Sequence, residues 1–159
     1  MCFWKNLAKF VGMKQSIDFL PERKQRDLHE LVGLIRNEVE DVVMIILYGS
    51  YARNTYVELD IRRDYGGGKI QYMSDYDILV VSKKRLGSRT VTVSSRVKSS
   101  FLKNKNANTQ TRPSIINESI TKFNNALSEG RYFYVDILTE GIVLYDSGEC
   151  QLATPCELN

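Results

Sequence analysis

The segment Val43-Met44-Ile45-Ile46-Leu47-Tyr48-Gly49-Ser50 decides the fold, together with Ser74-Asp75-Tyr76-Asp77-Ile78-Leu79-Val80-Val81. Each segment contains an apolar, β-branched run of the length of a buried strand. The first run stops at Gly49-Ser50, and the residues after it are compatible with a helix. A glycine at such a turn lets the backbone approach an anion, and a serine adds a hydroxyl beside free N–H groups. Gly49 and Ser50 are therefore predicted to seat phosphate groups.

The second segment carries two carboxylates that are two residues apart. On a strand, Asp75 and Asp77 point to the same side, and neighbouring carboxylates repel each other unless a cation lies between them. Either motif alone is also typical of an ordinary turn or a solvated strand end. Their combination, each at the end of an apolar strand where α/β sheets bind ligands, favours a site. The pair is predicted to bind a divalent metal that prefers oxygen ligands, most plausibly Mg²⁺.

These residues resemble the DNA polymerase beta-like nucleotidyltransferase superfamily, in its minimal nucleotidyltransferase form. Three segments are similar to the bacterial branch in which that domain precedes a HEPN domain, and the likeness runs from about Met13 to the C-terminus. The segments are Tyr48-Gly49-Ser50-Tyr51-Ala52-Arg53, Ser74-Asp75-Tyr76-Asp77-Ile78-Leu79-Val80-Val81 and Glu140-Gly141-Ile142-Val143-Leu144-Tyr145-Asp146-Ser147. The first two are specific as a pair, and the third supports the branch rather than the chemistry.

The resemblance implies transfer of a nucleoside monophosphate from a nucleoside triphosphate, with ATP expected, to an acceptor hydroxyl. Asp75 and Asp77 would hold Mg²⁺, two ions being expected with substrate, while Gly49 and Ser50 seat the β- and γ-phosphates. Arg53, one helical turn further on, would assist in binding the nucleotide. The sequence is equally compatible with Arg53 being an ordinary charged surface residue.

The superfamily commonly adds a third carboxylate on a strand beside the metal pair. Glu118 and Asp136 are the two candidates here. Glu118 is narrowly favoured, because it lies on a short predicted strand with Ser114 and Ile116. The segment lacks a clear hydrophobic-Asp-hydrophobic pattern, so catalytic competence depends on which residue fills this role.

The resemblance also implies an alternative of another class, a non-catalytic or antitoxin-like module that partners a HEPN domain in cis or in trans, as in toxin-antitoxin systems. Residues 13–149 are expected to form the nucleotidyltransferase domain and 150–159 a tail, which would be a linker to a HEPN domain. Residues 1–12 read as an amphipathic extension that packs on the domain or on a partner, or else Met13 is the natural start.

Composition agrees with one globular domain. Of the 159 residues, 43% are hydrophobic and 26% are charged, which is ordinary for a protein with its own core. No apolar run approaches the ~20 residues of a membrane span, so a cytoplasmic protein without a membrane partner is expected. Three cysteines without Cys-x-x-Cys spacing predict neither a disulfide framework nor a structural zinc site.

The expected architecture is α/β, with a mixed twisted sheet of about four or five strands and helices mainly on one face. Residues 21–39 carry a helical apolar stripe, with His29 near its edge and given no role. Residues 56–73 alternate on both sides of Gly66-Gly67-Gly68, which predicts an inserted β-hairpin with a flexible tip. Residues 114–118 read as a strand, residues 120–130 as a helix, and residues 132–137 alternate in hydrophobicity.

Residues 83–112 contain nine basic residues and no acidic one. They read equally as a solvated, poorly ordered connection and as a basic surface that steers a nucleoside triphosphate or an anionic acceptor such as RNA. An RNA acceptor is the less favoured of these, because aromatic residues are not interleaved with the basic ones.

Overall fold

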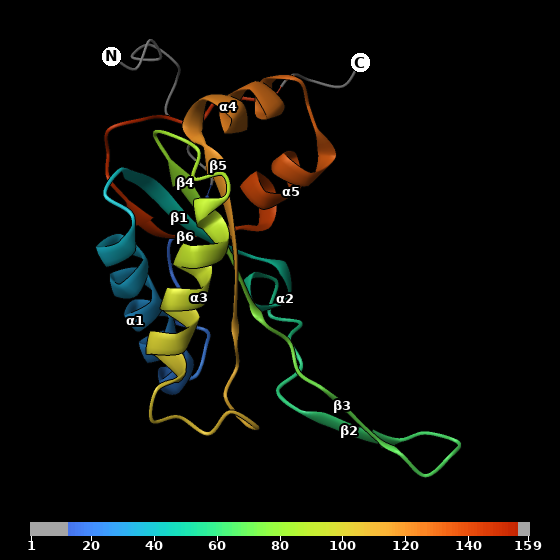
Figure 1. The fold of residues 1–159 in the computed structure, drawn as a ribbon. Coiled ribbons are helices and arrows are strands. Elements are labelled where there is room, and N and C mark those ends of the chain that lie inside the picture. The colour runs from blue at the N-terminus through green and yellow to red at the C-terminus, as the bar shows by residue number, and fades with distance from the viewer. Residues whose placement is uncertain (1–12, 156–159) are drawn as a thin grey trace.

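The structure is a computed structural model that describes residues 13–155, and these form five helices and six strands (Figure 1). In chain order the elements are α1 (Glu22–Glu38), β1 (Val42–Tyr48), α2 (Gly49–Ala52), β2 (Asp60–Arg63), β3 (Lys69–Tyr72), β4 (Tyr76–Ser82), α3 (Arg89–Leu102), β5 (Pro113–Ser119), α4 (Ile120–Ser128), α5 (Tyr132–Glu140) and β6 (Ile142–Asp146).

The main sheet has four strands in the order β5-β4-β1-β6. Strand β4 runs parallel to β5, and β1 is antiparallel to both of its neighbours, so the sheet is mixed. The α/β fold class predicted from the sequence is confirmed. The end of β1 and the start of β4 lie at the same edge of the sheet, where Tyr48 pairs with Asp77.

Helices cover both faces of this sheet, and the expectation that they lie mainly on one face is wrong. Alternate side chains of β1 and β4 enter two separate hydrophobic clusters. Ile45 and Ile78 belong to the cluster that includes α1 and α3, while Ile46 and Leu79 belong to the one that includes α4 and α5. The physical reason is the composition of these strands, whose central residues are apolar on both faces and need cover on both sides.

Helix α1 confirms the helix predicted for residues 21–39. Its Leu28, Leu31 and Ile35 are fully buried in the first cluster, and Pro21 stands just before the first turn. His29 is exposed on the opposite side of the helix.

The predicted hairpin is also confirmed. Strands β2 and β3 form a separate two-stranded sheet, which extends away from the body of the protein (Figure 1). Strand β2 begins at Asp60, whereas the alternating pattern in the sequence begins at residue 56. At the tip, Asp64 Oδ1 accepts hydrogen bonds from the N–H groups of Gly66 and Gly68, at 3.0 and 2.6 Å.

Two segments form helices that the sequence analysis did not predict. Residues 83–112 are not a poorly ordered connection, because they contain α3, which buries Val93, Val97 and Phe101 at spacings of four residues. The alternating segment 132–137 is part of helix α5, whose Ile137 and Leu138 are buried in the second cluster.

The packed part of the chain continues beyond residue 149, where the tail was expected to begin. Cys150, Leu152 and Ala153 are buried in the second cluster. The extension 1–12, with Cys2, and Cys156 lie outside the described residues. Within residues 13–155, the structure contains no helix with the length and apolar character needed to cross a membrane.

Candidate active site

Gly49 brings the two sequence motifs together. Its φ is 71°, in the left-handed region that favours glycine. A Cβ atom built on Gly49 would collide with Oδ2 of Asp77 and would lie 3.1 Å from Cγ of the same residue. The backbone turn after β1 and the carboxylate of β4 are therefore in direct contact, and only a glycine leaves room for that carboxylate.

The sheet register sets the surroundings of Asp77. On one side it pairs with Tyr48 of β1 and on the other with Ser114 of β5. Because in-register neighbours project from the same face of a sheet, the three side chains form a row on the face covered by α4 and α5. Asp77 is half-buried in this row, whereas Asp75, just before β4, is exposed.

The electrostatics of the pair agree with a place for a cation. Burial raises the pKa of Asp77, and the negative charge of Asp75 raises it further, while the positive charge of Arg53 lowers it. Burial and the charge of Asp77 also raise the pKa of Tyr48 to about 12, so its hydroxyl stays protonated. Ionising both carboxylates is thus unfavourable unless a positive charge compensates them.

The predicted nucleotide-binding residues lie around this pair. Arg53 follows the short helix α2, and its Nη1 lies 3.3 Å from Oε2 of Glu140 at the end of α5. Ser50 is half-buried, and its hydroxyl has no hydrogen-bond partner among residues 13–155. The structure therefore brings Gly49, Ser50 and Arg53 to one edge of the sheet with the two carboxylates.

Glu118 does not lie at this edge. It pairs with Val81, four positions along β4 from Asp77. It is buried, where it accepts a 3.1 Å hydrogen bond from the Tyr134 hydroxyl and forms an ion pair with Lys122. Its contacts are those of a structural carboxylate that joins β5 to α4 and α5. The residue beside Asp77 on β5 is Ser114.

Asp136 lies on α5 rather than on a strand. It comes three residues after Phe133 and four before Glu140, so it shares a helix face with them. Phe133 packs edge-on against Tyr48, and Glu140 pairs with Arg53, which orients this face toward α2. Of the two candidates for the third carboxylate, Asp136 is the one that shares a helix face with residues that contact Tyr48 and Arg53.

The donor set fits magnesium bound together with substrate. Within residues 13–155, no group of three or more His, Cys, Asp and Glu side chains is close enough to hold a metal ion. Mg²⁺ is commonly held by one or two carboxylates, with waters and substrate phosphates as its other ligands. Asp75 and Asp77 satisfy that requirement, whereas a structural zinc site would need four protein ligands.

Tyr48 and Glu140 belong to the site but were not singled out by the sequence analysis. Tyr48 carries a local signal, because it directly precedes Gly49 and alternates with Ile46 toward the Asp77 side of the sheet. Glu140 opens the third family-like segment, but no spacing connects it with Arg53, 87 residues earlier. Only the packing of α5 against α2 brings these two together.

Comparisons with known proteins add a similarity of shape. No protein-family model matches the chain, and no curated protein matches it. Among solved structures, the chain is similar to a proposed nucleotidyltransferase from Sulfolobus solfataricus. That similarity has 16% sequence identity and a TM-score of 0.43, and it covers 86% of this chain and 93% of that one. A likeness at this level says nothing about the reaction, so the function depends on the site itself.

Proposed function

We propose that the chain is a Mg²⁺-dependent nucleotidyltransferase, which moves a nucleoside monophosphate from a nucleoside triphosphate to an acceptor hydroxyl. ATP is the expected donor. The observation that carries this proposal is the contact between Gly49 and Asp77. It joins a turn that an anion can approach closely with a carboxylate pair whose charges need a cation.

Each residue of the site contributes to this reaction. Asp75 and Asp77 would hold the metal, which would neutralise negative charge on the triphosphate and on the attacked phosphoryl group. The Ser50 hydroxyl donates to a phosphate oxygen of the donor. Arg53 adds a positive charge near Asp77 and is oriented by Glu140. Such a reaction depends mainly on positioning and charge, so a small number of groups suffices.

In the transfer step, the acceptor oxygen forms a bond to the α-phosphorus. The bond from that phosphorus to the oxygen bridging to the β-phosphorus breaks, and pyrophosphate leaves with the bonding electron pair. Asp75 is exposed at the edge of the site, where its carboxylate accepts the hydrogen bond of the attacking hydroxyl and then its proton.

The second candidate is binding of a triphosphate without transfer, as expected for an interaction module that partners a HEPN domain. The observation that favours it is Ser114, which occupies the position beside Asp77 on β5 where a third carboxylate would stand. In this alternative the site orders the protein around a bound nucleotide, and no pyrophosphate is released.

One experiment separates the two candidates. The protein is incubated with Mg²⁺, each of the four triphosphates labelled at the α-phosphate, and a lysate that supplies acceptors. Transfer predicts label in protein, RNA or a small molecule together with pyrophosphate release, and both signals are lost in Asp77→Asn. Triphosphate binding that depends on Asp77 without any label transfer would support the interaction module instead.

A further inference from the structure

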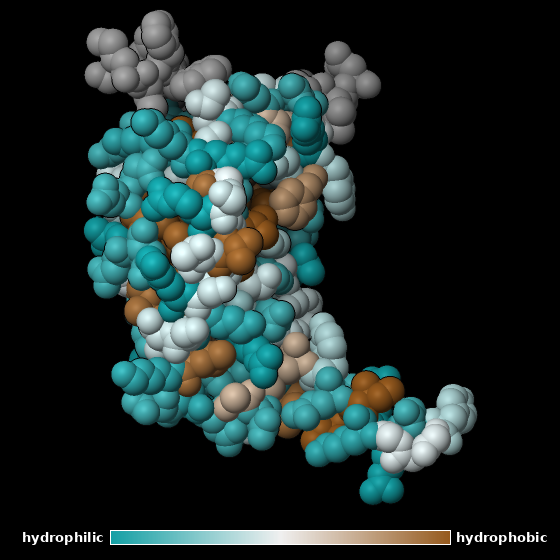
Figure 2. Space-filling view, in the orientation of Figure 1, coloured by the Kyte–Doolittle hydropathy of each residue, from teal (hydrophilic) through white to brown (hydrophobic). Residues whose placement is uncertain are grey.

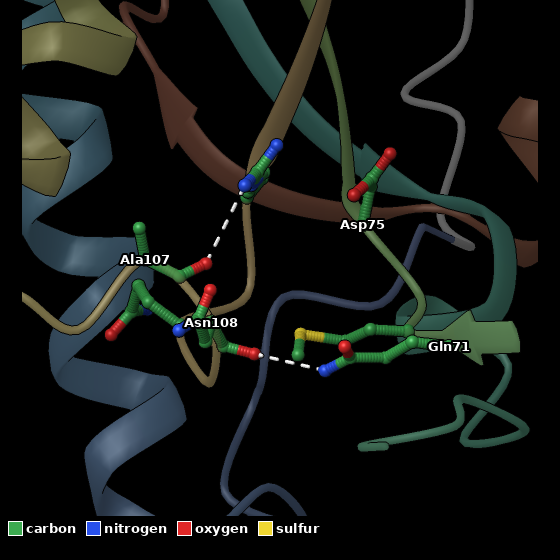
Figure 3. Close-up of a pocket in the computed structure, with 7 residues that line it drawn as sticks. Gln71, Asp75, Ala107 and Asn108 are labelled. Carbon is green, nitrogen blue, oxygen red and sulfur yellow. Dashed lines mark hydrogen bonds between the residues drawn. The ribbon is translucent and has the colours of Figure 1, made fainter. Parts of the chain in front are cut away.

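A cavity adjoins Asp75. Its volume is about 270 Å³, and it lies between the hairpin and the loop of residues 103–112 (Figure 3). Figure 3 shows Asp75 on one side of the cavity and Ala107 and Asn108 on the other. The cavity is lined mainly by polar side chains, namely Gln71, Asp75, Asn108, Gln110 and Arg112, with Met73. It therefore offers a polar compartment directly beside the proposed metal pair.

The loop side of the cavity is fixed to α1. The Lys24 ammonium donates a 2.6 Å hydrogen bond to Thr111 Oγ1, and Gln110 Nε2 donates one of 2.9 Å to Asp27 Oδ2. Lys105 forms an ion pair with Glu30. On the hairpin side, the base of the hairpin is tied to α1 by ion pairs of Glu58 with Arg23 and Lys24. One 3.4 Å hydrogen bond, from Gln71 Nε2 to the Asn108 carbonyl, joins β3 to the loop across the cavity.

Arg112 supplies a positive charge to this cavity. Tyr76 pairs with Pro113 in the parallel register, so Arg112 lies beside Asp75 at the starts of their strands. Its Nη2 donates a 3.5 Å hydrogen bond to the Ala107 carbonyl, and it has no carboxylate partner in the described part of the chain. Most of its donors remain free for an anionic group, and a guanidinium binds phosphate well.

Two further positive charges lie outward along the hairpin. Lys69, Gln71, Met73 and Asp75 occupy alternate positions, so Lys69 lies on the hairpin face that carries Gln71 to the cavity. Arg63 is directly opposite Lys69 in the register of β2 and β3. Like charges directly opposed across two strands are destabilising, and neither has an ion-pair partner among residues 13–155.

The other face of the hairpin provides a contrast. There Arg62 forms a 2.7 Å ion pair with Asp60, so its charge is already compensated. Figure 2 shows hydrophobic residues at the surface of the hairpin. Its exposed residues include Ile61, Tyr65, Ile70 and Tyr72. Tyr72 lies on this face, directly opposite Asp60, so the face of Arg63 and Lys69 offers positive charge rather than this aromatic ring. Basic grooves that follow the phosphate backbone are typical of surfaces that bind single-stranded nucleic acid.

We infer that the acceptor is the hydroxyl end of a single-stranded nucleic acid. Its terminal nucleotide occupies the cavity beside Asp75, with a phosphate on Arg112. The preceding phosphates follow the hairpin face to Arg63 and Lys69. This assignment rests on the proposed function, because it names the acceptor of that same site. It also gives the inserted hairpin a task, which is to hold the strand while its end reacts.

Binding of labelled single strands tests this assignment without any turnover. Fluorescence anisotropy is measured for RNA and DNA strands of about 2, 6 and 12 nucleotides, without triphosphate or Mg²⁺. Affinity should rise once the strand is long enough to reach Arg63 and Lys69, and should fall with added salt. Because the readout is binding alone, failure here leaves the transfer reaction untouched. Failure of transfer in the labelled-triphosphate experiment likewise leaves this binding untouched.

Two variants separate the cavity from the hairpin. Arg63→Glu creates an opposite-charge pair with Lys69, which stabilises the hairpin while removing its positive charge. It should weaken binding of the longer strands roughly tenfold and leave the shortest strand unaffected. Arg112→Gln should weaken binding of all lengths, since it acts at the strand end.

The matched control is Arg89→Glu, which makes the same change of charge at the exposed start of α3. It should leave the affinity unchanged. Equal losses in Arg63→Glu and Arg89→Glu would overturn the assignment, since they would indicate attraction by net charge alone. Affinity that does not depend on strand length would also overturn it. So would equal affinity for a polyglutamate peptide, which would assign the surface to an acidic protein.

Discussion

Gly49→Ala tests whether the Asp77 carboxylate fills the space where a side chain would begin. Two costs add in this substitution. The left-handed backbone at φ 71° costs an alanine about 1 to 2 kcal/mol. The new Cβ would also displace the carboxylate of Asp77, or shift the backbone, for a further cost of about 1 to 3 kcal/mol. We expect a total loss of about 2 to 5 kcal/mol in the free energy of unfolding.

The chain provides a matched control for the backbone cost. Gly148 has a φ of 74°, and a Cβ built on it would meet nothing within 4 Å. Gly148→Ala should therefore lose only the backbone part, measured by urea unfolding under the same conditions. In an Asp77→Ala background, the cost of Gly49→Ala should fall to that of Gly148→Ala. If Gly49→Ala costs no more than Gly148→Ala in the wild-type background, the close contact with Asp77 is refuted.

Three further predictions concern single side chains. Ser50→Ala should weaken triphosphate binding by about 1.5 kcal/mol, roughly tenfold in Kd by calorimetry, without changing the melting temperature of the free protein; unchanged affinity would remove Ser50 from the site. The raised pKa of Asp77 means that the folded protein holds its proton more tightly than the unfolded chain does. Without metal, Asp77 therefore lowers the free energy of unfolding as the pH rises from its ordinary pKa of 3.8 to its higher folded-state pKa. Urea unfolding measured across this pH range should show that Asp77→Asn removes this part of the loss. Glu118→Gln should lower the free energy of unfolding by about 1 to 3 kcal/mol, because the Tyr134 hydroxyl and Lys122 lose a charged partner. It should leave any Mg²⁺-dependent rise in melting temperature intact, and loss of that rise would place Glu118 at the metal.

The sequence was most informative where strong local patterns agree with the final packing. The apolar runs of β1 and β4, the stripe of α1 and the glycine-rich hairpin each form the element that they predict. The Asp75 and Asp77 pair reaches the edge of the sheet because its own strand places it there. In these elements the local preference and the tertiary structure favour the same conformation.

The remaining elements depend on contacts between distant parts of the chain. Residues 132–137 alternate in hydrophobicity as a strand would. In the folded protein they form a helix, which packs Phe133 on Tyr48 and buries Ile137. The strand that contains Glu118 was correctly predicted. Its distance from Asp77, however, follows from the parallel register of β5 and β4, which no local pattern specifies.

Helix α3 is a different case, because its signal was present in the sequence. Val93, Val97 and Phe101 recur every four residues, as a buried helical stripe requires. The surrounding serines and threonines have modest helix propensity and hide this stripe. Packing against α1 decides the outcome, since Val93, Val97 and Phe101 are buried in the same cluster as the stripe of α1.

The metal pair is the central claim, and thermal unfolding with added Mg²⁺ tests it most directly. At a hundredfold excess over the dissociation constant, binding to the folded state alone adds about 2.7 kcal/mol. For a chain of 159 residues this corresponds to a rise of about 5 to 10 °C in the melting temperature. Asp77→Asn should lose this rise, and without metal it should be at least as stable as the wild type. If Asp77→Asn keeps the full Mg²⁺-dependent rise, the pair is not the metal site and the nucleotidyltransferase proposal fails with it.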